Sequence, residues 1–155
     1  LDSALHRIAS ASARPVALQP VLRDIWSNHV LFAAEEPARV AGVIDFHAAA
    51  VDTPATDLSR LLGSWPRGSR TPLATAWRDA LEAYEAVRPL AAEDRRLVPW
   101  LDATATIFGL DNWFRWILEE GRRFERSGAV LGRVDHLVRM LPDAVGWLNA
   151  PTEAV

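Results

Sequence analysis

The sequence predicts an α+β protein that is mainly α-helical, with one small β-hairpin packed on a bundle of helices. Two short apolar runs, HVLFA at 29–33 and VAGVID at 40–45, flank the turn-forming segment AEEPAR and have the pattern of two strands. Beyond residue 52 the apolar residues recur at helical spacing. Strands therefore do not alternate with helices, which argues against a Rossmann fold or a barrel. Since two strands alone are marginal in water, the hairpin must pack on the helices.

Helix boundaries are indicated by prolines and capping residues. The first 13 residues are expected to form a short helix, and the RPVALQP segment after it is expected to be a loop between two prolines. Thr53 and Pro54 combine an N-cap side chain with a proline at the first helical position, as do Thr71 and Pro72. Further helices are expected after Pro99 and over the last part of the chain.

Length and composition are those of one ordinary globular domain. The chain has 155 residues, of which 50% are hydrophobic and 24% charged, and a chain of this size can bury a single core. The formal charge of −3 provides no basic surface for nucleic acid. No apolar run reaches the roughly 18 residues of a membrane span, and the chain does not open with a signal-peptide pattern. We therefore expect a cytoplasmic protein without a membrane partner.

Two residue types are missing, and each absence excludes a class of chemistry. The chain has no cysteine, which excludes disulfides and thiolate metal sites. All 17 basic residues are arginine. Without lysine, this chain has no P-loop lysine, no kinase-type nucleotide lysine and no Schiff base.

Two aspartates flank the predicted hairpin. Asp24 precedes its first strand and Asp45 ends its second, where a core hydrophobe would be expected. Because a hairpin returns the chain to its starting point, both carboxylates should lie at the same edge. An unpaired buried carboxylate is very costly, so Asp45 should be exposed or paired with a cation or metal. Two carboxylates at one edge suit phosphoryl transfer, in which one aspartate accepts the proton of the attacking hydroxyl and another holds Mg²⁺.

The segments LRDIWSNH, GVIDF and DTPATDLSRLL together resemble the catalytic region of the aminoglycoside phosphotransferase family. This family also includes choline- and homoserine-kinase-like enzymes and shares the protein-kinase fold. The resemblance implies that residues 1–155 are a single domain, a kinase-like C-terminal lobe whose hairpin carries the catalytic and metal loops. It also implies ATP as co-substrate, Mg²⁺ as cofactor and a small-molecule hydroxyl as acceptor.

The resemblance assigns roles position by position. Asp24 falls on the catalytic-base position, Asp45 on the metal-binding aspartate, and Asp57 on the structural aspartate that steadies the catalytic loop. The family has a metal-binding asparagine five residues after the catalytic aspartate. Here that position is His29, and Asn28 lies one residue earlier. Either Asn28 reaches the metal through a shifted loop, or His29 replaces the asparagine, or the metal site is weakened.

The residues next to the two aspartates also differ from the family pattern. Leu22 and Arg23 stand where the family has His-Gly or a similar pair. Arg23 can still pair with a carboxylate or phosphate and support the loop, as the arginine of a protein-kinase catalytic loop does. His47, two residues after Asp45, is explained more simply as a loop residue than as part of the cleft.

The family's N-terminal lobe, with its glycine-rich loop and nucleotide lysine, has no counterpart in the first 22 residues. We therefore expect this chain to be one lobe of a longer protein, with no appreciable kinase activity by itself. The surface on which the other lobe would dock should be apolar, so homo-oligomers formed through that surface are a further expectation.

Late helices of the C-terminal lobe line the acceptor pocket in the family. In LDNWFRWILEE, the candidate substrate contacts are Asp111, Asn112, Trp113, Glu119 and Glu120, although aromatic residues at this spacing more often belong to a core. Two other interpretations stay open at this point. One is a degenerate, non-catalytic kinase-like module that binds a partner or ligand, and the other is a helical domain whose aspartates only cap loops.

Overall fold

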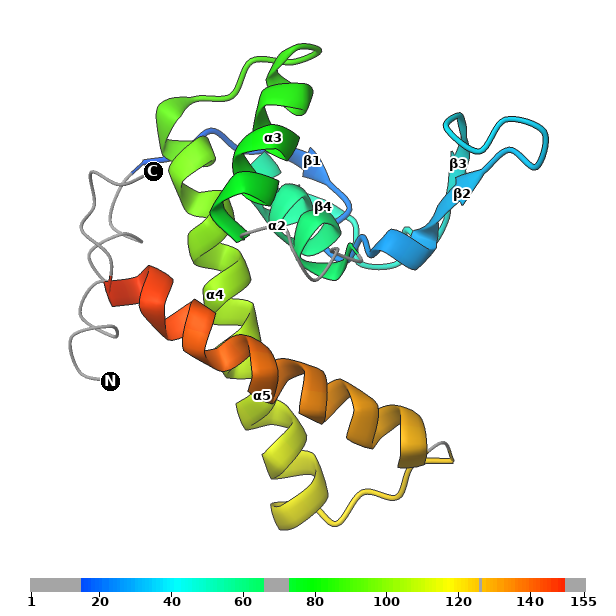
Figure 1. The fold of residues 1–155 in the computed structure, drawn as a ribbon, viewed down its shortest axis with the longest axis vertical. Helices are drawn as coiled ribbons and strands as arrows, with labels where there is room; N and C mark the ends of the chain where they lie inside the picture. The colour runs from blue at the N-terminus through cyan, green and yellow to red at the C-terminus, as the bar shows by residue number, and fades with distance from the viewer. Residues whose placement is uncertain (1–14, 66–72, 126, 150–155) are drawn as a thin grey trace. The chain divides into compact units, whose positions relative to one another are not determined.

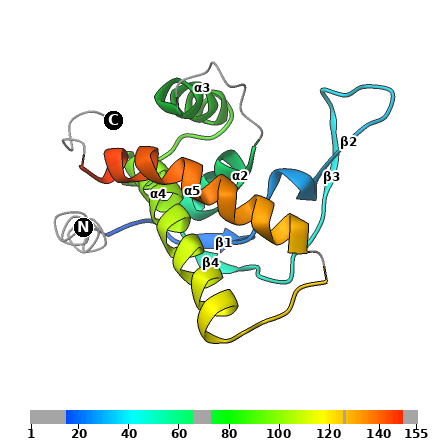
Figure 2. The ribbon, with the colours of Figure 1, turned by 60° about the horizontal axis from the view of Figure 1, so that its bottom comes forward.

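The computed structural model describes residues 15–65, 73–125 and 127–149. The described residues form two compact units, one before and one after residue 100: the first lies within residues 15–99, and the second within residues 100–149. Figures 1 and 2 show the elements in chain order, from β1 in blue to α5 in orange and red. The helix predicted over the first 13 residues, and the second Thr-Pro pair at 71–72, lie outside the described residues.

The first unit contains a two-stranded sheet that the sequence pattern does not predict. Strand β1 (Gln19–Val21) pairs with β4 (Ala50–Asp52) in antiparallel fashion. Each strand has only three residues, and Pro20 in the middle of β1 argues against a strand in any sequence-based assignment. The RPVALQP segment, which is predicted to be a loop, therefore ends in the first two residues of β1. The pairing of Gln19 with Asp52 brings together the two ends of the intervening chain.

A second sheet lies within that intervening chain and confirms the predicted hairpin. Strand β2 (Val30–Phe32) pairs with β3 (Val40–Val43), and Figure 2 shows this ribbon and the β1–β4 ribbon as separate sheets. A short 3₁₀ turn, η1 (Ser27–His29), leads into β2. The prediction that Asp45 ends the second strand is wrong, because β3 ends at Val43 and Asp45 lies two residues beyond it.

Helix α2 (Pro54–Ser64) follows β4 almost directly and confirms the predicted helix start. Thr53 caps it, because Oγ1 accepts the N–H of Ala55 at 3.2 Å. The helix contacts both β1 and η1, and so supports the segment that joins them. The buried apolar side chains of this region are Val21, Ile25, Ala55 and Leu58.

Helix α3 (Leu73–Glu85) and the first part of helix α4 (Ala92–Phe114), up to Pro99, complete the first unit. Helix α3 buries Trp77 and Leu81. Helix α4 begins well before Pro99 and continues through it, so the prediction that this helix starts after the proline is wrong. The acidic side chains of its first turn, Glu93 and Asp94, suit the positive end of the helix dipole and mark the true start. Asp94 is 2% exposed, and its carboxylate accepts a hydrogen bond from the hydroxyl of Thr53.

In the second unit, α4 ends in a π-helical turn, η2 (Arg115–Glu119), and α5 (Ser127–Asn149) follows. The buried cluster of this unit joins the two long helices; it comprises Ala103, Ala144 and Leu148, with Trp100, Ile107 and Trp147 packed against it. The described residues thus confirm a mainly helical α+β fold with helices after the hairpin. None of the described helices has the length and apolar character needed to cross a membrane.

Replacing Thr53 with alanine should destabilise the protein by about 2 kcal/mol, because it removes the α2 cap and the hydroxyl that donates to the buried Asp94 carboxylate. Thr53→Ser keeps the hydroxyl and should stay within about 1 kcal/mol of the wild type. Chemical denaturation of both variants measures the difference. Equal stability of T53A and T53S would show that the hydroxyl contributes nothing.

Candidate functional site

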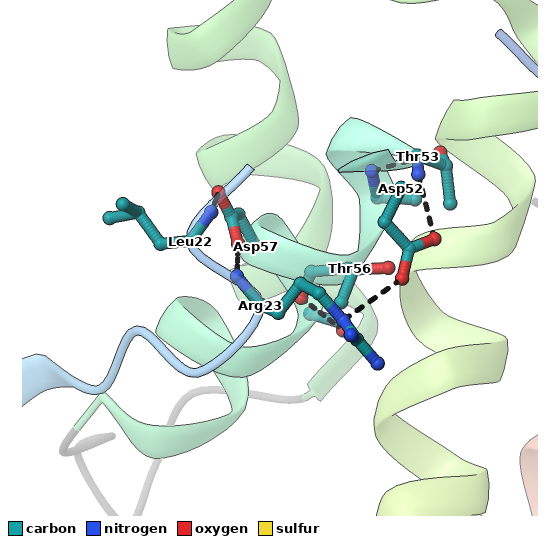
Figure 3. Close-up of polar contacts among 8 residues, drawn as sticks. Leu22, Arg23, Asp52, Thr53, Thr56 and Asp57 are labelled. Carbon is teal, nitrogen blue, oxygen red and sulfur yellow. Dashed lines mark hydrogen bonds and ion pairs between the residues drawn. The ribbon is translucent and has the colours of Figure 1, made fainter. Parts of the chain in front are cut away.

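The loop over residues 22–29 begins with two backbone amides bound by one carboxylate. Asp57, in the first turn of α2, accepts the N–H of Leu22 at 2.9 Å through Oδ2 and the N–H of Arg23 at 2.7 Å through Oδ1 (Figure 3). Leu22 directly follows β1, and α2 starts just after β4. The pairing of these strands therefore places the carboxylate beside the two amides. Both oxygens of Asp57 fix the backbone immediately before Asp24.

Arg23 adopts a left-handed backbone conformation, with φ at 65°. This conformation costs a non-glycine residue roughly 1–2 kcal/mol, whereas glycine adopts it freely. The arginine is held by the hydrogen bond that its backbone N–H donates to Asp57 and by an ion pair, with Nε 3.5 Å from Asp52 Oδ2. Asp52 is itself oriented by the N–H of Thr53, which donates to Oδ1 at 2.8 Å, as Figure 3 shows.

Asp24 is half-buried and accepts the indole N–H of Trp26 at 2.8 Å. The guanidinium carbon of Arg60 lies 5.6 Å from the centroid of the Trp26 ring, within the range of a cation–π contact. Arg60 belongs to α2, so the same helix that binds the start of the loop also supports the indole that orients Asp24.

Asp45 lies just beyond the end of β3, also in left-handed backbone, with φ at 69°. The N–H of Ile44 donates to the carbonyl of His29 at 3.0 Å, which extends the β2–β3 pairing and brings Asp45 to the end of the loop. Its carboxylate is 40% exposed. His29 Nε2 lies 3.8 Å from Asp45 Oδ2, and His47 Nδ1 is hydrogen-bonded to Asp45 Oδ1.

The charges of these groups are coupled. The hydrogen bond from His47 lowers the pKa of Asp45; partial desolvation opposes the shift, and the positive charges of His47 and His29 add to it. The same hydrogen bond raises the pKa of His47, as do the negative charges of Asp45 and, more weakly, Asp24. Both carboxylates therefore act on one imidazole. We call Asp24, His29, Asp45 and His47 the two-aspartate site.

Of the two residues considered as second metal contact, it is His29 whose side chain lies next to Asp45, and Asn28 is exposed. Within residues 15–65, 73–125 and 127–149, no three His, Asp or Glu side chains gather into a protein-only metal centre. Mg²⁺ does not need one, because it is commonly bound by one or two carboxylates and completes its shell with phosphate oxygens and water. The exposed carboxylate of Asp45, with His29 beside it, fits that mode of binding.

The candidate substrate contacts lie in the second unit, around η2. Trp113 packs edge-on against Trp116, with ring centroids 5.1 Å apart, and against Phe124 at 5.4 Å. This is an aromatic cluster local to the end of α4 and the chain after it. The indole of Trp113 thus contributes to packing within its own unit.

Two of the four polar candidates around the same turn, Asn112 and Glu120, are bound to neighbouring arginines. Asn112 Oδ1 accepts a hydrogen bond from Arg115 at 2.7 Å. Glu120 pairs with Arg122 at 2.6 Å and with Arg115 at 3.6 Å. The remaining two candidates, Asp111 and Glu119, are exposed.

Several residues that build the site are not found by sequence reasoning. His47 is interpreted there as a loop residue, yet its ring binds Asp45; its place two residues after that aspartate was the available signal. Asp52 has a weaker signal, as the first acidic residue of VDTPATD. Ser64 has none, because its contact with Ser27 joins residues far apart in the chain.

Comparison with known proteins places these residues in a family. The profile of the phosphotransferase enzyme family matches residues 2–90. A homoserine kinase of Gluconacetobacter diazotrophicus is 32% identical over 141 residues, which span 88% of this chain and 41% of that protein. Homoserine kinases of Acidiphilium cryptum (34% identical, 70% of this chain, 34% of that protein) and Granulibacter bethesdensis (29% identical, 76% of this chain, 36% of that protein) are also similar.

The matched part of the chain therefore spans 34–41% of the length of these relatives. The family profile covers more than half of the chain and includes every residue of the two-aspartate site. The chain belongs to the phosphotransferase enzyme family.

Proposed function

We propose that this chain is the catalytic-loop and substrate-binding part of an ATP- and Mg²⁺-dependent phosphotransferase that acts on a hydroxyl group of a small molecule. The observation that carries the proposal is that the loop whose start is held by Asp57 carries both Asp24 and His29, and that His29 Nε2 lies 3.8 Å from Asp45 Oδ2. Family membership supplies the reaction class. Homoserine is the first acceptor to test, because the similar relatives are named homoserine kinases.

In this proposal Asp24 orients the attacking hydroxyl and accepts its proton. The indole N–H of Trp26 fixes the direction of the carboxylate, and Asp57 fixes the backbone before it. Both supports belong to the protein and do not depend on the substrate. Such fixed positioning matters because phosphoryl transfer is catalysed largely by alignment and electrostatic stabilisation.

Asp45 and His29 are the residues that would hold Mg²⁺, which when bound would neutralise charge on the phosphate oxygens of ATP. The lowered pKa of Asp45 favours its ionised form, as a metal ligand requires. Imidazole is a poorer partner for Mg²⁺ than an amide oxygen. This half of the site should therefore bind Mg²⁺ less tightly than a site with asparagine in place of His29.

We further propose that residues 1–155 act as one functional lobe and that a nucleotide-clamping lobe outside this chain completes the site. Support comes from large apolar side chains exposed on and next to the β2–β3 pair, where such a lobe would dock: Leu31, Phe32, Val40, Ile44 and Phe46. In the absence of that lobe, the same apolar surface would favour association between copies of the chain.

A second candidate function is a non-catalytic kinase-like module that binds a ligand or partner. The observation in its favour is that both oxygens of Asp45 face histidines, one of which stands where the family has asparagine. Phosphoryl transfer by the wild-type full-length protein would exclude this alternative.

In the full-length protein, Asp24→Asn should lower kcat about 10²–10⁴-fold, because an amide cannot accept the proton of the acceptor hydroxyl. Asp79→Asn is the matched control, since it makes the same change at an exposed carboxylate of α3 that pairs with Arg78. A steady-state assay with ATP, Mg²⁺ and homoserine measures both variants. Turnover of D24N close to that of wild type would refute the role of Asp24.

Replacement of His29 tests the metal half of the site. His29→Asn restores the family residue and should lower the Mg²⁺ concentration for half-maximal activity, because an amide oxygen suits Mg²⁺ better than an imidazole nitrogen. His29→Ala removes the side chain and should raise that concentration. Activity measured against Mg²⁺ at fixed ATP gives both values. An unchanged or lowered value in H29A would mean that His29 does not contact the metal.

The pairing of His47 with Asp45 can be measured by an NMR titration of the histidine ring. The midpoint should lie above the ordinary value of about 6.5, because Asp45 accepts its hydrogen bond and carries a negative charge. The pair stabilises the fold where Asp45 is ionised and His47 is protonated. Its contribution is lost as pH rises through the raised pKa of His47 and as pH falls through the lowered pKa of Asp45. Asp45→Asn should return the midpoint toward the ordinary value; an unchanged midpoint would contradict the pairing.

A further inference from the structure

Helix α2 contacts the loop over residues 22–29 at a second place, through its last residue. The N–H of Ser27 donates to Ser64 Oγ at 2.8 Å, and the hydroxyl of Ser27 donates to the carbonyl oxygen of Ser64 at 2.9 Å. The hydroxyl of Ser64 donates in turn to the carbonyl of Leu61 at 2.9 Å, so its lone pairs are left to accept from Ser27. We call this pair of bonds the serine clamp.

The serine clamp uses backbone groups that helix ends leave without partners. Ser64 is the last residue of α2, where the final carbonyls have no intrahelical donor. Ser27 is the first residue of η1, where the first N–H groups have no intrahelical acceptor. The two termini therefore satisfy each other. Both bonds are partly buried, so water does not replace them freely.

The serine clamp fixes the part of the loop that carries His29. The turn η1 runs from Ser27 to His29, and the N–H of His29 donates to the carbonyl of Trp26 at 2.9 Å. Once Ser27 is bound to α2, the position of His29 has little freedom, and its ring faces Asp45 at 3.8 Å.

Helix α2 thus holds the loop at two points. Asp57 binds the amides before Asp24, and Ser64 binds the turn that leads to His29. The two anchors are seven residues apart in the sequence, which is about 10 Å along a helix. A rigid helix therefore sets the separation between the proton-accepting half and the metal half of the site.

We infer that Ser64 is a positioning residue for the metal half of the two-aspartate site, acting through Ser27, whereas Asp57 positions the half that carries Asp24. The inference rests on the proposed function. Loss of the Ser64 hydroxyl should therefore weaken metal binding while leaving turnover at saturating metal close to that of the wild type.

The test compares Ser64→Ala with two other variants of the full-length protein. Ser64→Thr keeps the hydroxyl. Ser59→Ala is the matched control, because the buried Ser59 also donates its hydroxyl to the carbonyl three residues back in α2, that of Thr56.

Mn²⁺ affinity in the presence of ATP, measured by water-proton relaxation, gives a readout that does not need activity. Hydrogen-exchange mass spectrometry reports on the amide of Ser27, and the Mg²⁺ dependence of kcat completes the set.

S64A should bind Mn²⁺ about tenfold more weakly, the size of effect that loss of a group supporting a metal ligand typically has. Exchange at Ser27 should become faster, while kcat at saturating Mg²⁺ stays close to wild type. S64T and S59A should keep the wild-type Mn²⁺ affinity.

Two results would overturn the inference. Faster exchange at Ser27 with unchanged Mn²⁺ affinity would make the serine clamp purely structural, and equal losses in S64A and S59A would trace the effect to general destabilisation of α2. The proposed function fails separately if the wild type binds Mn²⁺ but transfers no phosphate, and the Mn²⁺ affinities then still decide the role of Ser64. If the wild type does not bind Mn²⁺ with ATP, both ideas are wrong.

Discussion

The site depends on one carboxylate that accepts two backbone amides. Asp57 binds the N–H groups of Leu22 and Arg23, and hydrogen bonds to an ionised acceptor are roughly twice as strong as neutral ones. Those hydrogen bonds hold Arg23 in a left-handed backbone conformation that a non-glycine residue disfavours. The backbone of Arg23 in turn sets the direction in which Asp24 leaves the chain. The loop is therefore shaped by a long-range contact with α2 rather than by its own sequence. A change that moved the first turn of α2 would move Asp24 with it.

The position of Asp57 is itself set from outside the helix. The β1–β4 pair fixes the strand that leads into α2, and Thr53, the residue directly after β4, caps the helix. The hydroxyl of Thr53 also donates to the buried carboxylate of Asp94 in the first turn of α4. Strand pairing, cap and buried hydrogen bond thus locate the start of α2 together. Since Asp57 lies in the first turn, its charge also interacts favourably with the helix dipole.

The features that the sequence predicts are those with a local signal. The apolar runs on either side of AEEPAR predict the β2–β3 pair, and Thr53 with Pro54 predicts the start of α2. The β1–β4 pair has no such signal, because its strands are three residues long and one contains Pro20. The early start of α4 is the opposite case: its acidic first turn is a local signal, but Pro99 inside the helix is a stronger signal for a boundary.

The same distinction holds within the site. The carboxylates of Asp24, Asp45 and Asp57 stand out in the sequence because each occurs in a recognisable motif. The groups that orient them come from elsewhere in the chain or have no motif of their own. The bond from the hydroxyl of Ser27 to Ser64 is an example, since it joins residues 37 positions apart. Long-range hydrogen bonds of this kind are settled by tertiary packing, which a single sequence does not reveal.

Backbone strain favours a functional interpretation over the view that the aspartates only cap loops. Among the described residues, the non-glycine positions with positive φ are Arg23 and Asp45. One directly precedes Asp24, and the other is the second carboxylate of the site. Left-handed backbone costs a residue such as arginine roughly 1–2 kcal/mol, and it persists only where surrounding contacts over-determine it. Aspartate adopts this conformation more readily, so the strain lies mainly at Arg23. Asp57 and Asp52 provide those contacts for Arg23. A capping aspartate needs no such arrangement, because ordinary loop conformations already let its carboxylate reach nearby amides. The chain instead holds a strained backbone directly before Asp24, as expected where the direction of that carboxylate matters for chemistry.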